Sequence, residues 1–288
     1  MDMFLLTGSL IIGLIIGSFL NVVIVRYPKM LQRDWEKECR AFLNLPQTDS
    51  SHQIAHSDIS LALPRSHCPH CQHPLKLRHN IPLLSFIFLG GRCQYCRQRI
   101  SRRYPIIEAS MALLTLAAVW RFGWQPDFSA QAIFAVLFIA LIITLCGIDL
   151  EHQLLPDIMT LGGLWLGLCM NSFNVFTPLF EALWSAVLGY GFLWLTSWIF
   201  LKIRQKQGMG HGDFKMLAMT GAWLGSLNTL NTLLFAVLFG CLISLILLAL
   251  RKAEWQRPIP FGPFLGAGAL ASLFLGPFML NWLWAPLS

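Results

Sequence analysis

Apolar runs of about 20 residues recur along this chain, and each is long enough to cross the hydrocarbon core of a membrane. The 288-residue sequence is 56% hydrophobic and only 12% charged. Such a composition does not suit a water-soluble globular protein. The first run has no Lys or Arg before it and no small-residue cleavage signature after it. We therefore predict that it is a retained membrane span and not a signal peptide.

The apolar segments predict an all-α polytopic membrane protein with about eight transmembrane helices. Their bounds are roughly 3–25, 105–120, 130–148, 158–175, 178–201, 214–227, 229–250 and 260–283. The sixth segment is short and contains glycine, so it could be re-entrant. In that case the next span would carry the basic residues of 251–257 outside. The charge distribution therefore favours a true crossing.

The basic residues predict how these segments are oriented. Lys and Arg number 21, and all except Arg121 fall within 26–103, 202–215 or 251–257. With eight crossings and the N-terminus outside, these clusters share one side, which the positive-inside rule identifies as cytoplasmic. The net charge of +7 then reflects membrane topology. No basic stripe with interleaved aromatic residues predicts nucleic-acid binding.

A metal-binding signature lies in the only sizeable polar region, residues 27–104. Cys68-x-x-Cys71 is followed, after 21 residues, by Cys93-x-x-Cys96. Two such pairs can supply four thiolates to a tetrahedral zinc site. Disulfides are the competing interpretation, but we expect this segment in the reducing cytoplasm. We predict a structural Zn²⁺ site that supplies much of the folding energy of a region with little core.

The other residues of this region and the remaining cysteines are interpreted as structural. Residues 27–64 carry mixed charge and then a Ser/His/Asp-rich stretch, which predicts a short helix followed by a loop. Four thiolates fill a zinc coordination shell, so three nearby histidines are expected around the site: His67, His70 and His73. The scattered cysteines are expected to be small buried side chains: Cys39, Cys146, Cys169 and Cys241.

Two aspartates from different apolar segments are expected at the same membrane depth. Asp149 ends the third segment in "CGIDLEHQLLPD", and Asp213 begins the sixth in "GMGHGDFKM". An acid in a membrane span is costly and usually faces the bundle interior or a wet cavity. Two carboxyl groups that share a proton can activate water and polarise a carbonyl. We therefore predict Asp149 and Asp213 as a catalytic pair. Helix capping alone would explain one aspartate but not the matched depth.

The residues around the pair suggest further hypotheses. Gly210 and Gly212 are expected to let the backbone leave helical geometry and a substrate strand approach closely. Asp213 opens a helix while Asp149 closes one, so the helix dipoles predict that the shared proton rests more often on Asp149. Two other acids suit helix starts: Glu108, which could instead pair with a nearby Arg or line the cavity, and Asp157, which is assigned a structural role with a supporting role near the catalytic pair as the alternative.

Taken in order, these motifs resemble the type IV prepilin peptidases, bifunctional enzymes of bacterial inner membranes. Matching stretches run along nearly the whole chain: "GSFLNVVIVRYP", both Cys-x-x-Cys pairs, "SRRYPIIE", "GIDLEHQLLPD", "GMGHGDFK" and "PFGPFLGAGAL". The resemblance implies a GxGD-type membrane aspartic endopeptidase. Such an enzyme cleaves the leaders of type IV prepilins and type II pseudopilins after a glycine, at the cytoplasmic membrane face. The catalytic aspartates of the family match Asp149 and Asp213.

The resemblance also implies that the new N-terminal residue is methylated with S-adenosylmethionine. No Gly-x-Gly-x-x-Gly loop after a strand locates the methyl-donor site. The expected partners are prepilin and pseudopilin substrates and the lipid bilayer, with no nucleic acid. The expected location is the bacterial inner membrane, with the N-terminus periplasmic and the active site at the cytoplasmic face.

Three parts of the chain follow from this interpretation. Residues 1–26 form a first transmembrane helix, 27–104 a cytoplasmic segment with the four-cysteine zinc site, and 105–288 a transmembrane peptidase bundle. Two alternatives remain. A proton- or cation-coupled secondary transporter would use the aspartates as ion sites, but such acids usually lie near the membrane midplane, often in an internal repeat. A non-catalytic assembly scaffold would use the zinc segment for docking.

Overall fold

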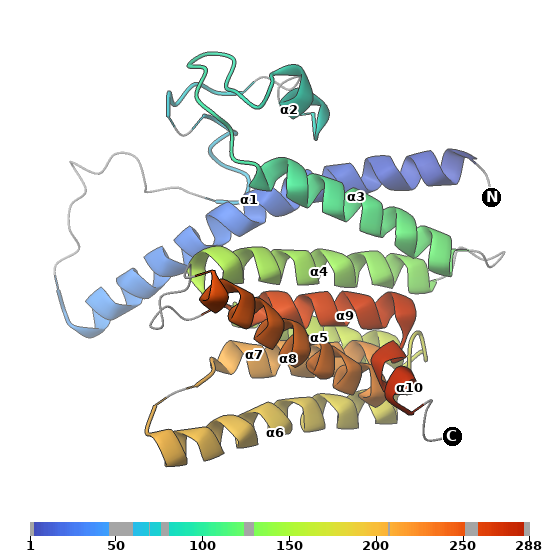
Figure 1. Ribbon diagram of the computed structural model, residues 1–288. Helices are drawn as coiled ribbons and strands as arrows, with labels where there is room; N and C mark the ends of the chain where they lie inside the picture. The colour runs from blue at the N-terminus through green and yellow to red at the C-terminus, as the bar shows by residue number, and fades with distance from the viewer. Residues whose placement is uncertain are drawn as a thin grey trace. The chain divides into compact units, whose positions relative to one another are not determined.

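The computed structural model describes residues 3–45, 60–68, 70–75, 81–123, 130–206, 208–250 and 259–284. Within these ranges the regular structure is helical, apart from two isolated β-bridges in the cysteine-rich segment. The all-α prediction is thereby confirmed (Figure 1). The chain forms two compact units, Met1–Ala117 (unit 1) and Ala118–Ser288 (unit 2), and each is described by itself.

Unit 1 contains a first helix that is longer than the sequence predicts. Helix α1 (Met3–Phe42) passes through Pro28 and continues into the mixed-charge region, so the predicted separate short helix is wrong. The side chains of Glu36 and Arg40 pair across one turn of this extension, with Oε1 and Nη2 2.8 Å apart. Such pairs stabilise an exposed helix. The other helices that begin in unit 1 are α2 (Leu84–Phe88) and α3 (Arg103–Phe122).

Small residues bring α1 and α3 close together within unit 1. A Cβ atom added to Gly13 would lie 2.6 Å from the Cα of Ala112, and one added to Gly17 would lie 2.8 Å from the Cα of Glu108. Close backbone approach through small residues is typical of helix packing in membranes. The Asn21 side chain adds a hydrogen bond of 3.1 Å to a backbone carbonyl of α3.

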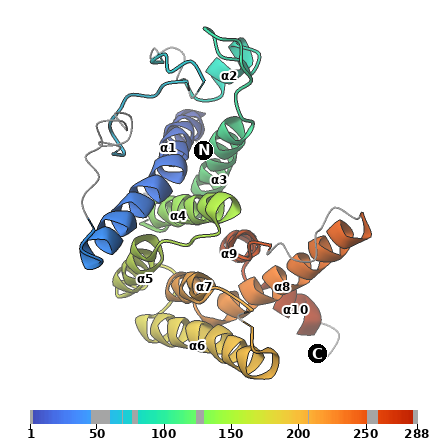
Figure 2. The same cartoon turned by 90° about the vertical axis from the view of Figure 1, so that its left-hand side faces the viewer.

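Unit 2 is an up-and-down bundle in which successive helices from α4 to α9 alternate in direction (Figure 1). Consequently α4 ends where α7 and α9 begin. Helix α7 lies in the middle, packed against α5, α6, α8 and α9 (Figure 2). The helices are α4 (Ala130–His152), α5 (Asp157–Asn171), α6 (Leu179–Arg204), α7 (His211–Leu224), α8 (Ser226–Ala249), α9 (Gly262–Leu275) and α10 (Phe278–Trp284).

Five helices of the described chain are long and apolar enough to cross a membrane: α1, α3, α4, α6 and α8. The expected fourth, sixth and eighth segments correspond to the shorter helices α5, α7 and α9, which have 15, 14 and 14 residues. Helices of that length extend about 21–22 Å, less than a hydrocarbon core of about 30 Å. The expected single helix over 260–283 is wrong, because Gly276, with φ 65°, separates α9 from α10.

The end of α7 far from its first turn is fixed by α5. The Asn171 side-chain amide donates to the carbonyls of Ala222 and Trp223, at 2.8 and 3.0 Å. These carbonyls have no partner within the helix because it ends there. The indole of Trp223 in turn donates to the Gly163 carbonyl at 2.8 Å. Together these bonds fix the axial position of α7, and therefore the position of its first turn.

Candidate active site and metal centre

Asp149 lies in the last turn of α4 and is 6% exposed. The apolar side chains of Ile142, Leu145 and Ile148 on the same helix are fully buried. The Oδ2 atom of Asp149 accepts a hydrogen bond of 3.0 Å from the Gly262 amide. Gly262 begins α9, where the first amides lack helical partners and the helix dipole favours an anion. A helix start from elsewhere in the chain therefore holds this carboxylate.

This contact changes the expectation about the shared proton. That expectation considered only the C-terminal end of α4, which disfavours a negative charge on Asp149. The N-terminal end of α9 acts in the opposite direction through the Gly262 amide. The observed geometry therefore gives no support to placing the shared proton on Asp149.

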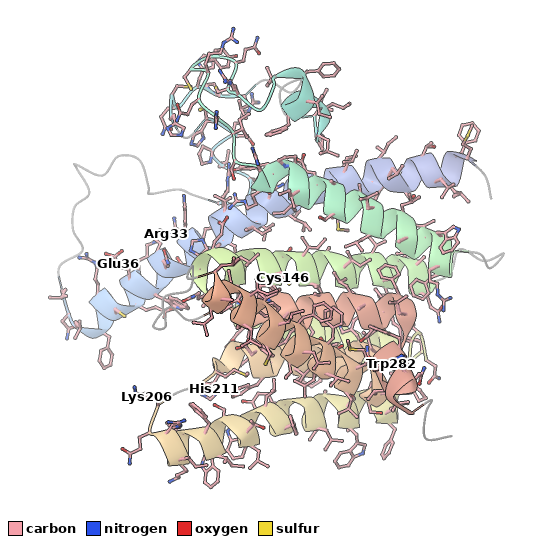
Figure 3. The ribbon with its side chains drawn as sticks, in the orientation of Figure 1. Arg33, Glu36, Cys146, Lys206, His211 and Trp282 are labelled. Atoms are coloured by element: carbon pink, nitrogen blue, oxygen red, sulfur yellow. The ribbon has the colours of Figure 1, made fainter. Side chains whose placement is uncertain are left out.

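Gly262 has a steric reason to be a glycine. A Cβ atom added there would lie 2.6 Å from the Oδ2 atom of Asp149, far inside ordinary contact distance. One turn earlier on α4, the Cys146 thiol lies 3.7 Å from the Gly262 carbonyl oxygen, to which it donates (Figure 3). Both the amide and the carbonyl of this glycine are thus bonded to α4. Sequence reasoning did not assign Gly262 or Cys146 to the site.

Asp213 lies in the first turn of α7 and is 8% exposed. Gly210, the residue just before this helix, lies beside the carboxylate: a Cβ atom built on Gly210 would be 3.7 Å from Asp213 Oδ2. In the first turn of α7 the helix dipole favours a negative charge on Asp213. A negative charge on Asp149, in contrast, acts unfavourably on a charge at Asp213. The structure therefore brings the two predicted aspartates to one end of unit 2, within electrostatic range of each other.

The glycines of the Asp213 motif fit the prediction only in part, since the backbone leaves helical geometry at Gly210 but not at Gly212. Gly210 has φ −76° and ψ 146°, an extended conformation open to any residue, and Gly212 lies inside α7. Backbone freedom is therefore not why they are glycines, and that part of the prediction is wrong. A Cβ atom on Gly212 would lie 2.7 Å from the Cβ atom of Leu155, so close packing explains this position. A Cβ atom on Gly210 would make only ordinary contacts, the nearest at 3.7 Å from Asp213 Oδ2.

Charged neighbours tie the start of α7 to the start of α5. The Lys215 ammonium lies 2.6 Å from Oδ1 of Asp157, which stands in the first turn of α5. Asp157 is thus the ion-pair partner of Lys215, which agrees with a structural role. The ring of His211 packs edge-on against Phe214, with centroids 5.2 Å apart (Figure 3).

The four predicted metal ligands form one cluster. The sulfur atoms of Cys68, Cys71, Cys93 and Cys96 all lie within 4.8 Å of one another. The Cys68 and Cys96 sulfurs are 3.8 Å apart. Tetrahedral zinc with Zn–S bonds of about 2.3 Å requires sulfurs about 3.8 Å apart. The cluster could therefore hold a metal ion such as zinc.

The two cysteine pairs have the same local structure. The Cys68 amide donates to the carbonyl five residues later at 3.1 Å, and its carbonyl accepts from the amide four residues later at 2.9 Å. Cys93 repeats both contacts, at 2.8 and 3.0 Å. The residue after each second cysteine has a positive φ, 57° at Gln72 and 59° at Arg97. The cluster is thus built from two matching knuckles.

Backbone amides in the second knuckle favour a thiolate. The amides of Cys96 and Tyr95 donate to the Cys93 sulfur and lower the pKa of that thiol to about 7. At Cys96 the Gln98 amide lowers the pKa, but partial loss of solvent around this exposed side chain and the neighbouring sulfurs outweigh it and raise the pKa to about 11. A thiolate is the form that binds metal.

The expectation that the other cysteines are buried is wrong for three of them, which are exposed: Cys39, Cys169 and Cys241.

Two family models and several curated proteins match the chain. The Bacterial Peptidase A24 N-terminal domain matches residues 11–122, and the Type IV leader peptidase family matches residues 135–248. A protein of Stutzerimonas stutzeri is 44% identical over 268 residues, which cover 93% of this chain and 90% of the relative. This chain belongs to the type IV leader peptidase family. The resemblance noted in the sequence is thereby confirmed.

Other relatives of this type IV leader peptidase agree. Proteins of Pseudomonas aeruginosa and Legionella pneumophila are each 42% identical to it. The aligned residues cover 93% and 97% of this chain, and 89% and 94% of the respective relatives. All three proteins are named prepilin leader peptidase/N-methyltransferase. No solved structure matches the chain.

The acid at Glu108 joins two parts of unit 1 in this type IV leader peptidase. Its Oε2 atom accepts a hydrogen bond of 2.8 Å from the Leu83 amide, the residue just before α2. Glu108 itself is buried in the second turn of α3. The acid therefore holds the cysteine-rich segment against α3. It does not merely mark a helix start, as the sequence suggested.

Proposed function

We infer that this protein is a membrane prepilin leader peptidase that also carries N-methyltransferase activity. The observation that carries this inference is the similarity, along 93% of the chain, to a protein named for both activities. The convergence of two buried aspartates at one end of unit 2 agrees with an aspartic peptidase. The transporter alternative has no support from these relatives.

We propose Asp149 and Asp213 as the catalytic pair. One carboxylate takes a proton from a water molecule, which attacks the scissile carbonyl, while the protonated partner polarises the carbonyl oxygen. The acid that took the proton from water then delivers it to the nitrogen of the leaving amine as the tetrahedral intermediate collapses. The Gly262 amide holds Oδ2 of Asp149 and leaves the other oxygen for water. Cleavage after a glycine of a prepilin or pseudopilin leader is the reaction we assign to this pair.

The open edge beside Gly210 supports substrate entry at this end of unit 2. Gly210 is exposed and extended, and no atom lies within 3.7 Å of a Cβ built on it. An extended peptide can therefore approach the first turn of α7. Both aspartates, in contrast, are more than nine-tenths buried. The substrate backbone thus reaches the pair from an open edge while water contact stays limited.

We propose S-adenosylmethionine as the methyl donor of the second reaction. Its sulfonium group supplies an electrophilic methyl group. The free amine of the new N-terminus would attack that methyl carbon as the methyl–sulfur bond breaks, the neutral thioether S-adenosylhomocysteine would leave, and loss of a proton from nitrogen would give a secondary amine. The substrate of methylation is thus the product of the peptidase reaction.

We propose that the four cysteines hold a structural Zn²⁺ ion. Four thiolates complete a tetrahedral shell and leave no open position for water, as in structural zinc sites. The ion would join two knuckles that are 25 residues apart in the sequence. Its chemical contribution is the cross-link between them.

We propose a bacterial inner-membrane location with a periplasmic N-terminus and a cytoplasmic active site. The basic clusters favour this orientation by the positive-inside rule. About eight crossings would require the short helices α5, α7 and α9 to span a bilayer beside longer neighbours. We retain the proposed parts 1–26, 27–104 and 105–288, with the lipid bilayer and prepilin-like substrates as partners.

Purified full-length enzyme with a prepilin-like peptide tests the proposal. Asp149→Asn and Asp213→Asn should each abolish cleavage while the protein keeps its elution volume and melting temperature. Asp157→Asn is the matched control, because it changes an exposed aspartate at the same end of the bundle. Methylation is measured separately on a pre-cleaved peptide. Normal turnover in either catalytic variant would exclude that residue from the reaction.

A further inference from the structure

The chain between Asp58 and Glu108 is cationic without any compensating acid. It contains no Asp or Glu and these basic residues: Arg65, Lys76, Arg78, Arg92, Arg97, Arg99, Arg102 and Arg103. A zinc ion with four thiolates would add a formal charge of only about −2. Four arginines around and just after the second knuckle are exposed, and we name them the arginine cluster: Arg92, Arg97, Arg99 and Arg102.

Helix α2, just before this cluster, exposes an apolar face. Leu84, Ile87 and Phe88 lie at the spacing of one helix face and are 50%, 68% and 84% exposed, and Ile81, just before the helix, is 44% exposed. Phe86, on the other side, is only half-exposed and lies against Gly91. Four large apolar side chains side by side are unfavourable in water. This face therefore needs an apolar environment.

The hydrogen bond between Leu83 and Glu108 fixes the depth of α2. Glu108 lies in the second turn of α3, a helix long and apolar enough to cross a membrane. Its bond to the Leu83 amide holds the beginning of α2 beside that turn, past the arginines that precede α3. Both ribbon views show α2 near the beginning of α3 (Figures 1 and 2). Helix α2 is thus held at the level of the membrane surface and not far out in solvent.

We propose that α2 and the arginine cluster form an anchor on the membrane surface. The apolar face of α2 inserts at the boundary of headgroups and acyl chains, and the arginines bind the phosphates of anionic phospholipids. Apolar and aromatic side chains flanked by cations are the composition of interfacial membrane segments. Cationic side chains near such a surface are attracted by its negative potential. Part of the region 27–104 is then in contact with lipid.

Photo-crosslinking tests the apolar face in full-length, zinc-loaded protein. A benzophenone amino acid replaces Phe88 in nanodiscs of phosphatidylcholine and phosphatidylglycerol. We expect adducts with lipid acyl chains. The same group at Phe42, which is 86% exposed at the end of α1, is the control. Helix α1 has 40 residues, so it is about 60 Å long and its end extends beyond a core of about 30 Å. Adducts only with protein, or labelling no greater than at Phe42, would overturn the anchor.

The arginine cluster is tested by the lipid class that is captured. The fraction of residue 88 adducts that contain phosphatidylglycerol should exceed the fraction of that lipid in the bilayer. Changing the four arginines to Gln should remove this preference, with up to about a fivefold change for each arginine in full contact. The control is Lys202→Gln with Arg204→Gln, which removes charge at the end of α6. Zinc content and melting temperature report folding. If the variant with all four arginines changed does not fold, the single variants Arg99→Gln and Arg102→Gln provide the test of the arginine contacts. An unchanged lipid ratio in folded variants refutes the arginine contacts.

Discussion

The two chemically distinctive clusters of this protein are held in opposite ways. In unit 2 the aspartates belong to helices packed around α7, where every residue from Met216 to Leu224 is buried. In the described part of 60–100, by contrast, only Cys68 and Cys93 are buried. The proposed peptidase centre is therefore positioned by helix packing and by the Gly262 amide. The cysteine cluster has almost no core, so a metal ion is the cross-link that remains available.

The largest expected effect comes from Gly262→Ala. The new Cβ would lie 2.6 Å from Asp149 Oδ2, so the carboxylate or α9 must move. A displacement of about 1 Å at a reacting group can reduce a rate by about 100-fold, and we expect a loss of kcat/KM at least that large. Peptide cleavage is the measurement. Gly191→Ala is the control, because no atom of unit 2 lies within 4 Å of the added carbon. Full activity in Gly262→Ala would show that packing does not fix Asp149.

The second prediction concerns the cysteine cluster. Cys68→Ser should abolish stoichiometric zinc binding, because the remaining sulfurs cannot complete the tetrahedral shell. Metal analysis and amide hydrogen exchange measure the effect. Exchange should accelerate within 60–100 and stay unchanged in α7. Cys39→Ser, an exposed cysteine outside the cluster, is the control. Equal zinc content in the two variants would contradict the cluster, and faster exchange in α7 would contradict the contrast between the two regions.

The third prediction separates packed from open glycines on α5. A Cβ atom at Gly167 would lie 2.5 Å from the ring of Trp223, whereas one at Gly162 would meet no atom within 4 Å. Overpacking of this kind costs about 1–3 kcal/mol. Gly167→Ala should therefore lower the melting temperature, and Gly162→Ala should leave it unchanged or raise it. Equal melting temperatures would mean that α5 and α7 are not closely packed.

The sequence predicted the two clusters well for a physical reason. Asp149, Asp213 and the four cysteines lie in short motifs whose chemistry is local, and helices that alternate in direction place the two aspartates at one end of unit 2. The Gly262 contact could not be predicted in this way, because it joins residues 113 positions apart. It depends on how α9 packs against α4, and no local pattern reports that packing.

Two other differences between the prediction and the structure arise at residue types that are compatible with more than one local structure. The charges after Pro28 suggested a separate soluble helix, but a buried proline can be accommodated within a helix and α1 continues to Phe42. The glycines before Asp213 suggested an unusual backbone, yet Gly212 is explained by contact with Leu155. Packing thus selected the structure at Gly212, whereas the part of α1 after Pro28 is exposed and is supported by the local Glu36–Arg40 pair.

The smallest expected effect concerns the Lys215–Asp157 ion pair. Its atoms are 2.6 Å apart, but the Asp157 side chain is 62% exposed, so solvent and salt screen the attraction. A cycle of Lys215→Gln, Asp157→Asn and the double variant should give a coupling below about 1 kcal/mol in unfolding free energy. Raising the salt concentration should reduce it further.

The kcat/KM of peptide cleavage by the Lys215 and Asp157 variants is a further test of the comparison between the two regions. Asp213 is already positioned by the buried body of α7, so loss of the ion pair should reduce kcat/KM by less than about tenfold. A larger loss in both single variants, restored in a charge-reversed pair, would show that a surface ion pair positions Asp213. The peptidase centre would then depend on the same kind of exposed cross-link as the cysteine cluster, and the contrast between the two regions would fail.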